Sequence, residues 1–205
     1  MKINYQLETD KIIEEATKKV EVPTLLLHSC CAPCSSYVIL YLSNYFKITV
    51  YFYNPNIMPN KEYKRRLMEQ KKLIKTVTTK YPIDFIEGDY EPKIFLTEVK
   101  GLEHEPEGRD RCFKCYKLRL EQTAKRAKEK KFDYFTTTLT VSPYKNADKI
   151  NEIGKKLENE YNVKFLVSDF KKRNGYLESI KLSKKYNLYR QDYCGCAFSK
   201  INTSL

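Results

Sequence analysis

The chain has 205 residues and a formal net charge of +12, and at this length we expect a single domain over residues 1–205. No apolar run approaches the roughly 20 residues of a membrane-spanning helix, and the N-terminal stretch lacks the apolar core of a signal peptide, so we expect a cytoplasmic protein. The basic charge favours acidic partners, with nucleic acid ahead of a membrane surface.

Predicted helices and strands alternate along the chain. Runs rich in β-branched and aromatic residues predict strands, and apolar residues spaced three and four apart predict helices. In chain order we expect a helix over 11–19, a strand over 25–27, a helix over 34–46, a strand over 47–53, a helix over 60–77, a strand over 83–86, a short helix over 93–99, a helix over 112–130, a strand over 132–141, a helix after 143, a strand over 164–167 and a helix over 174–186. This alternation predicts an α/β fold, with a mostly parallel sheet and helices on both faces.

Two residues are placed to cap helices. Asn60 is expected to cap the helix over 60–77. Ser142 is expected to cap the helix after it, because Pro143 then stands at the first helical position, where its missing N–H costs nothing. The basic residues along 60–77 form either a solvated face or a place for phosphate groups.

The seven cysteines of the chain lie in three short clusters. Cys30, Cys31 and Cys34 form the first cluster, directly after the strand over 25–27, and Pro33 suits the first turn of the helix that follows. The first cluster is therefore expected in the loop beyond the carboxyl end of a strand, where open α/β sheets bind ligands. The second cluster is Cys112 with Cys115, and the third is Cys194 with Cys196.

The odd number and the clustering of the cysteines disfavour a static disulfide framework and indicate metal binding or redox chemistry. Cys112 and Cys115 face the same side of a helix start, and Cys30 and Cys31 converge if their loop turns sharply. These two pairs supply four thiolates, a set that suits structural zinc or an iron–sulfur cluster. Surplus thiols favour the redox interpretation, because a structural zinc site is satisfied by four ligands.

The other polar candidates carry less weight. His28 ends the leucine strand and is expected to have a structural role. His104 lies in an acidic loop and is expected to be solvated. Glycine is scarce, at six residues, and the chain has no Gly-rich loop of the kind that cradles phosphates.

The three clusters, in this order and spacing, resemble the pattern of the cobalamin-independent epoxyqueuosine reductase family QueH. The resemblance implies iron–sulfur-dependent reduction of epoxyqueuosine to queuosine at the wobble position of tRNA, the last step of queuosine biosynthesis. It also implies a fold like the nucleotide-binding domain of tRNA-modifying ATP pyrophosphatases, although the chain lacks their phosphate loop. The motifs that match, within roughly residues 25–198, are His28-x-Cys30-Cys31-Ala32-Pro33-Cys34, Cys112-x-x-Cys115-Tyr116 and Tyr193-Cys194-Gly195-Cys196.

The resemblance further implies roles for the individual thiols. Cys194 and Cys196 match the family's redox-active pair. An additional mononuclear iron is described for the family beside its [4Fe–4S] cluster, and Cys34 is expected to bind this second iron together with the same pair. The four thiols that match the ligands of the [4Fe–4S] cluster are Cys30, Cys31, Cys112 and Cys115.

The implied partners are tRNA, through its anticodon stem-loop, and an electron donor that the sequence does not identify. Arginine neutralises phosphate groups without reading the base sequence. The candidates for these phosphate contacts are Arg65, Arg66, Arg109 and Arg111.

Two other functions stay open on the residues alone. A zinc-stabilised RNA-binding module without catalysis would account for the charge and the cysteines. A thiol oxidoreductase would act through Cys194 and Cys196, whose disulfide would be strained and easily reduced.

Epoxide reduction takes two electrons and two protons, whereas a [4Fe–4S] cluster passes one electron at a time. The reductase therefore needs a second redox centre close by, either this dithiol or an iron.

Overall fold

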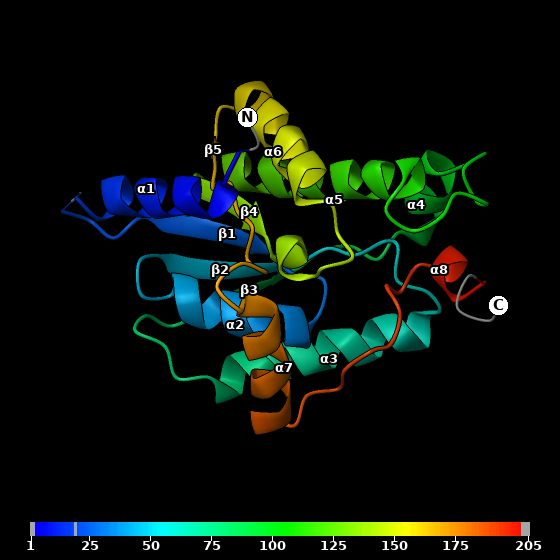
Figure 1. The fold of residues 1–205 in the computed structure, drawn as a ribbon, viewed down its shortest axis with the longest axis horizontal. Coiled ribbons are helices and arrows are strands. Elements are labelled where there is room, and N and C mark those ends of the chain that lie inside the picture. Colours follow the sequence, from blue (N-terminus) through cyan, green and yellow to red (C-terminus); the bar gives the residue numbers. More distant parts are fainter. Residues whose placement is uncertain (1–2, 19, 202–205) are drawn as a thin grey trace.

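The computed structural model describes residues 3–18 and 20–201, and its centre is one sheet of parallel strands. Neighbouring strands pair in the order β3-β2-β1-β4-β5, and every pair runs parallel. The strands are β1 (Thr24–His28), β2 (Lys47–Phe52), β3 (Asp84–Glu87), β4 (Tyr134–Thr137) and β5 (Lys164–Phe165). The predicted α/β fold with a parallel sheet is confirmed, and Figure 1 shows the sheet between two layers of helices.

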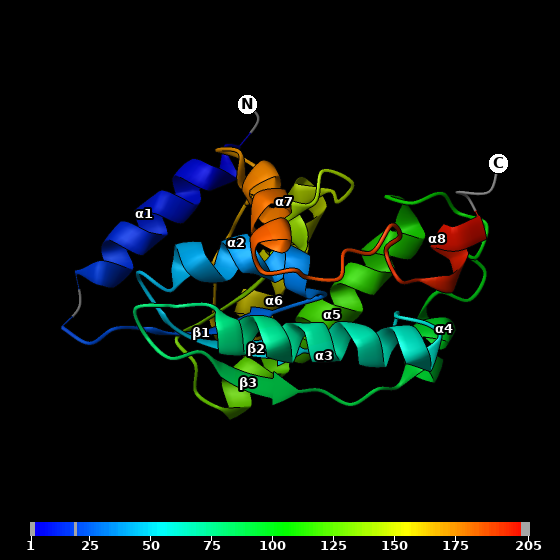
Figure 2. The same ribbon diagram turned by 90° about the horizontal axis from the view of Figure 1, so that it is seen from below.

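The helices cover both faces of the sheet. They are α1 (Tyr5–Thr17), α2 (Ala32–Leu42), α3 (Asn60–Thr76), α4 (Pro92–Glu98), α5 (Asp110–Glu129), α6 (Ala147–Tyr161), α7 (Gly175–Lys185) and α8 (Ala197–Ile201), with a 3-10 helix η1 (Thr138–Val141). Helices α2 and α3 pack on one face, and α7 packs against α2, as Figure 2 shows from below. Helices α5 and α6 pack on the other face.

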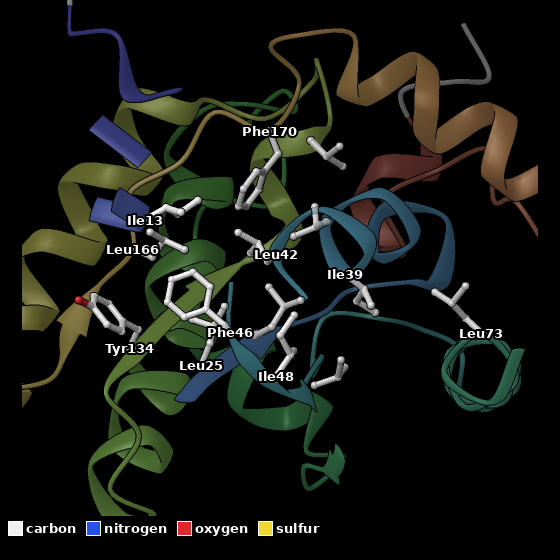
Figure 3. Close-up of a cluster of buried hydrophobic side chains, with 14 of the residues drawn as sticks. Ile13, Leu25, Ile39, Leu42, Phe46, Ile48, Leu73, Tyr134, Leu166 and Phe170 are labelled. Atoms are coloured by element: carbon white, nitrogen blue, oxygen red, sulfur yellow. The ribbon is translucent and has the colours of Figure 1, made fainter. Parts of the chain in front are cut away.

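β1 lies in the middle of the sheet and is buried on both faces. Leu25 and Leu27 pack into the core between the sheet and α2, and Leu26 packs against α5 on the opposite side. Figure 3 shows the first of these cores, where Leu25 lies near Phe46 and Ile48. A strand covered on both faces is expected to be apolar throughout, which explains the leucine run. Burial of each leucine stabilises the fold by about 1.5–3 kcal/mol.

Helix α1 begins earlier than predicted. It starts at Tyr5, because the side chain of Asn4 caps it by accepting a hydrogen bond from the N–H of Leu7 (3.4 Å). The predicted end of this helix, at Lys19, lies outside the described residues. Farther along the chain, α8 follows the third cysteine cluster and has no counterpart among the predicted elements.

The chain between β4 and α6 also departs from the prediction. The strand expected over 132–141 ends at Thr137. The side chain of Thr137 accepts a hydrogen bond from the N–H of Leu139 (3.2 Å), and this turns the backbone into η1. A threonine that bonds its own backbone in this way competes with the ladder of a strand.

Both predicted caps are wrong. Ser142 does not cap α6, because the helix begins after Asn146, whose side chain accepts a hydrogen bond from the N–H of Lys149 (2.9 Å). Asn60 is the first residue of α3, and Pro59 occupies the cap position before it. The other predicted elements are present, with ends that differ by a few residues.

The strand order reverses at β1. From β1 the chain moves outward to β2 and β3, and it then returns to the other side of β1 to form β4 and β5. Such a reversal opens a crevice beyond the carboxyl ends of the two strands concerned, here β1 and β4. Figure 1 shows the C-terminal segment and α8 near this end of the sheet. Among the described residues, no helix combines the length and apolarity needed to span a membrane.

Candidate active site

The first cysteine cluster lies in the turn between β1 and α2. The Sγ atoms of Cys30, Cys31 and Cys34 lie within 4.8 Å of one another, close enough to share a metal ion. The turn is held from the residues just after β2, because the side chain of Asn54 donates a hydrogen bond to the carbonyl of Ser29 (2.8 Å). This contact helps to fix the position of the thiols.

Hydrogen bonds favour a thiolate on Cys31. Hydrogen bonds with the thiols of Cys30 and Cys34 hold the pKa of Cys31 well below its ordinary value, whereas hydrogen bonds with Cys30 and Cys31, together with burial, raise the pKa of Cys34. The side-chain amide of Gln191 donates another hydrogen bond to the Cys31 sulfur (2.9 Å). Gln191 belongs to the C-terminal segment, which therefore reaches across the first cluster.

The second and third clusters line one small cavity against α5. Cys112 and Cys115 lie on the first two turns of α5, and Cys194 and Cys196 come from the segment that precedes α8. All seven cysteines are free. Burial raises the pKa of Cys115 to about 12, so this thiol keeps its proton at neutral pH unless a metal displaces it.

A cleft of about 450 Å³ opens beside this cavity. Cys30, Cys34 and Cys194 line the cleft, so the first and third clusters both face it. Cys194, Arg119 and Lys145 line the cavity as well, and they join the two hollows. The volume lies within the range of small-molecule sites, about 300–1,000 Å³.

The cleft occupies the crevice that the strand order predicts. Cys30 follows the carboxyl end of β1, and Leu139 and Val141 of η1 follow the carboxyl end of β4. The sequence-based expectation that the first cluster lies where open α/β sheets bind ligands agrees with this position.

The structure groups the thiols differently from the sets that the resemblance implies. It brings Cys34 together with Cys30 and Cys31, and it brings the second cluster together with the third. Cys30 links the first cluster to the other two. It packs against the same apolar cluster as Cys112, and it lines the cleft together with Cys194. The ligand sets therefore stay a prediction.

Arg66 is a structural residue and not a phosphate ligand. It is buried on α3, where its Nε lies 2.7 Å from the carboxylate of Glu62. Its two other nitrogens donate hydrogen bonds to the carbonyls of Cys194 (3.0 Å) and Tyr193 (3.2 Å). Gly195, the next residue along the chain, has φ +102° and packs directly against the guanidinium, so Arg66 holds the third cluster in place.

Arg111 is also unavailable to phosphate groups. It is buried, and its guanidinium donates hydrogen bonds to the carbonyls of Glu103 (2.8 Å) and Glu105. The predicted phosphate contacts of Arg66 and Arg111 are therefore wrong. Arg65 and Arg109 are exposed, and for them the prediction stands untested.

The two histidines behave as expected. His28 is buried between β4 and β2, where its ring bonds Thr137 Oγ1 (2.8 Å) and the carbonyl of Tyr53 (3.1 Å). Burial, aided by the positive charge of Arg119, lowers the pKa of His28 to about 4, so the ring is neutral at pH 7. His104 is exposed. Neither histidine lines the cleft.

Lys145 is a site residue that the sequence analysis missed. It is buried in the loop between η1 and α6, and its Nζ lies 2.5 Å from Glu107 and 3.1 Å from the Cys194 sulfur. Burial opposes the charge, but Cys194, Tyr116 and Glu107 hold the pKa of Lys145 well above its ordinary value. No motif marks this lysine, because only the folded chain brings its loop to α5.

The cavity suits an anionic metal–thiolate group. Lys145 and Arg119 place positive charge beside the four thiols of the second and third clusters. Arg119 Nη2 and Tyr116 Oη are buried and have no hydrogen-bond partner among the described residues. Buried polar groups normally have partners, and a cluster ligated by thiolates would supply acceptors and negative charge at this place.

Comparison with known proteins agrees with the motifs. The family model described as "Epoxyqueuosine reductase QueH" matches residues 25–202. The epoxyqueuosine reductase QueH of Staphylococcus epidermidis is 46% identical over 208 residues, which cover 100% of this chain and 87% of that protein. The Streptococcus pyogenes protein of that name is 44% identical over 97% of this chain and 78% of its own length. The Thermotoga maritima protein is 38% identical over 87% of this chain and 91% of its own length.

Proposed function

The chain belongs to the epoxyqueuosine reductase QueH family, and from this premise we propose that it reduces epoxyqueuosine to queuosine at the wobble position of tRNA with an iron–sulfur cofactor. The observation that carries the proposal is the convergence of all three cysteine clusters on one cavity and its adjoining cleft. The reaction belongs to the cytoplasm, where thiols stay reduced.

The proposed cofactor is a [4Fe–4S] cluster, which supplies electrons one at a time when bound. One packing contact favours the ligand set implied by the family, because Cys30 packs against the apolar cluster that contains Cys112. Cys194, Cys196 and Cys34 are then left for the second redox centre. They form it either as the ligands of a second iron or, for Cys194 and Cys196, as a dithiol. Cys34 and Cys194 both line the cleft, where a substrate would meet them. The four thiols proposed to hold the [4Fe–4S] cluster are Cys30, Cys31, Cys112 and Cys115.

The cleft is large enough for a single extruded nucleoside and not for a duplex. Enzymes that act on a base take it out of the stack to reach it. In our proposal the modified base enters past the exposed ring of Tyr144 and ends near Lys145. Two protons of the Lys145 ammonium are directed to Glu107 and Cys194, which leaves the third for the epoxide oxygen.

An external electron donor is required, since the reduction consumes two electrons and two protons and the oxygen leaves as water. Exposed basic residues outside the cleft supply the attraction for the tRNA backbone in this proposal, with Arg65 and Arg109 as named candidates.

Metal and sulfide analysis of protein purified without oxygen, followed by assay on tRNA carrying epoxyqueuosine, tests the proposal. The expected protein is brown, contains about four iron and four sulfide per chain, or about five iron with the second centre, and forms queuosine. Protein that holds only zinc and forms no queuosine would instead be an RNA-binding module. Colourless, metal-free protein that exchanges a disulfide at Cys194 and Cys196 would be a thiol oxidoreductase.

A further inference from the structure

Arg119 is a buried guanidinium whose hydrogen bonding is incomplete. Its side chain is 1% exposed on α5. Its Nε donates a hydrogen bond to the carbonyl of Cys115 (3.2 Å), and its Nη2 has no partner among the described residues. None of the ion pairs found in the described part of the chain includes Arg119. Removing such a charge from water costs several kcal/mol unless an anion offsets it.

The two other buried arginines have more hydrogen-bond partners than Arg119. Arg66 pairs with the carboxylate of Glu62 and donates to two carbonyls. Arg111 donates to two carbonyls of the loop before α5. Neither leaves a buried nitrogen unpartnered. The arrangement round Arg119 is therefore a local property of its site and not a general feature of the protein.

The groups near Arg119 that can become anionic are thiols and the phenol of Tyr116. Burial opposes the charge of Arg119, but the thiols of Cys115, Cys194 and Cys30, one from each cluster, raise its pKa above the ordinary value. Arg119 also lines both the cavity and the cleft. Metal binding converts thiols to thiolates, so its counter-charge becomes complete only when the cysteines hold metal.

We propose that Arg119 is the internal counter-ion of the metal–thiolate group, and that its Nη2 donates a hydrogen bond to that group and raises its reduction potential. This inference rests on the proposed function, because it needs the iron–sulfur cofactor. It makes Arg119 a positioning and tuning residue that does not itself touch the substrate.

The direction of the effect follows from charge. A [4Fe–4S] cluster with four thiolates becomes more negative by one unit when it accepts an electron. A fixed positive charge beside it, in surroundings of low dielectric, stabilises the reduced form more than the oxidised form. Hydrogen bonds to the sulfur atoms act in the same direction, and they are among the means by which proteins set cluster potentials.

The test compares Arg119→Met, Arg119→Lys and the wild type, all purified without oxygen, with Arg126→Met as the matched control. Arg126 lies two turns farther along α5, is partly exposed and pairs with Glu129, so its loss removes the same charge outside the site. Iron and sulfide per chain are measured first. The midpoint potential of the cluster is then titrated with dithionite and redox mediators, and the reduced state is followed by electron paramagnetic resonance.

We expect equal iron and sulfide in all four proteins, a more negative midpoint potential in Arg119→Met, a potential near that of the wild type in Arg119→Lys, and no change in Arg126→Met. A loaded Arg119→Met protein with the wild-type potential would overturn the inference. If Arg119→Met does not load, Arg119→Lys decides: loading with a near-wild-type potential supports the charge role, and failure to load shows that shape and not charge matters. A wild type without iron refutes the proposed function instead.

Discussion

At the scale of single residues, we expect substitutions of the cysteines to affect the two proposed redox centres differently. Cys115→Ser is expected to lose most of the iron and sulfide, because it removes one of the four proposed thiolate ligands from a buried site. Iron and acid-labile sulfide per chain measure this loss. Full occupancy of the cluster in the variant would contradict the assignment of Cys115.

Cys194→Ser and Cys196→Ser should behave in the opposite way. Both are expected to keep the cluster and its visible spectrum but to lose epoxide reduction, because one cluster delivers a single electron at a time. A second iron, if bound, should fall by about one per chain. The alternative outcome, loss of the whole cluster, would show that the third cluster belongs to the ligand set of the cavity, as the grouping with Cys112 and Cys115 suggests.

Tyr144 allows substrate entry to be observed directly. The ring is 73% exposed at the rim of the cleft, and the chain contains no tryptophan. Tyr144→Trp therefore creates a single fluorescent indole, which is expected to be quenched when an unmodified anticodon stem-loop RNA binds and a base stacks on it. Tyr81→Trp is the control, because Tyr81 precedes β3 at the opposite edge of the sheet. Equal quenching in both proteins would exclude entry past Tyr144.

At the scale of elements, the packing of α6 on β5 depends on one glycine. A Cβ on Gly154 would lie 2.2 Å from the ring of Phe165, in the core between helix and sheet. Alanine normally stabilises the interior of a helix by up to about 1 kcal/mol relative to glycine. Here Gly154→Ala is expected to destabilise the protein by about 1–3 kcal/mol, as overpacking does. Urea unfolding measures the change, and Lys155→Ala, on the exposed side of the same helix, should stay within about 0.5 kcal/mol.

The segment between α7 and α8 is anchored to α3 by the hydrogen bonds of Arg66, a buried residue that pairs with Glu62 on the same helix. Arg66→Met leaves the Glu62 carboxylate without its cation and removes the guanidinium donors from the carbonyls of Tyr193 and Cys194. We expect the free energy of unfolding to fall by about 3–5 kcal/mol, measured by urea denaturation. Arg65→Met is the control, because its exposed guanidinium stacks on Tyr189 and contributes about 0.5–1 kcal/mol. Equal losses in both variants would contradict the anchoring role.

The same elements indicate what the sequence could predict. The leucines of β1 are buried on both faces of the sheet, and their unbroken apolar run in the sequence is enough to predict the strand and to place the first cluster after it. The start of α6 was mispredicted because the choice between Ser142 and Asn146 depends on how the chain leaves η1. The burial of Arg66 could not be foreseen either, since its partners lie on the C-terminal segment. Local chemistry is readable from the sequence, whereas long-range partners are not.

At the scale of the whole molecule, the net charge of +12 is expected to draw tRNA to the enzyme. Its affinity for tRNA should fall linearly with salt on a log–log plot. Arg65→Ala and Arg109→Ala should each reduce the slope by about one, as the loss of one phosphate contact requires. Binding titrations at several salt concentrations measure the slopes. Lys80→Ala, in the loop before the amino end of β3, should leave the slope unchanged, and an equal decrease there would mean that the charge acts without a defined docking face.

The positions of the cysteines along the chain have a consequence for how the protein matures during synthesis on the ribosome. The cysteines round Arg119 come from the beginning, the middle and the end of the described chain, at Cys30, Cys115 and Cys194. All five strands are synthesised before Cys194 appears, and at roughly 5–20 residues per second the first cluster waits several seconds or more for the third. The sheet can form during translation, whereas the proposed metal centre cannot be complete before Cys194 is synthesised, so we expect the metal to bind at or after the end of synthesis.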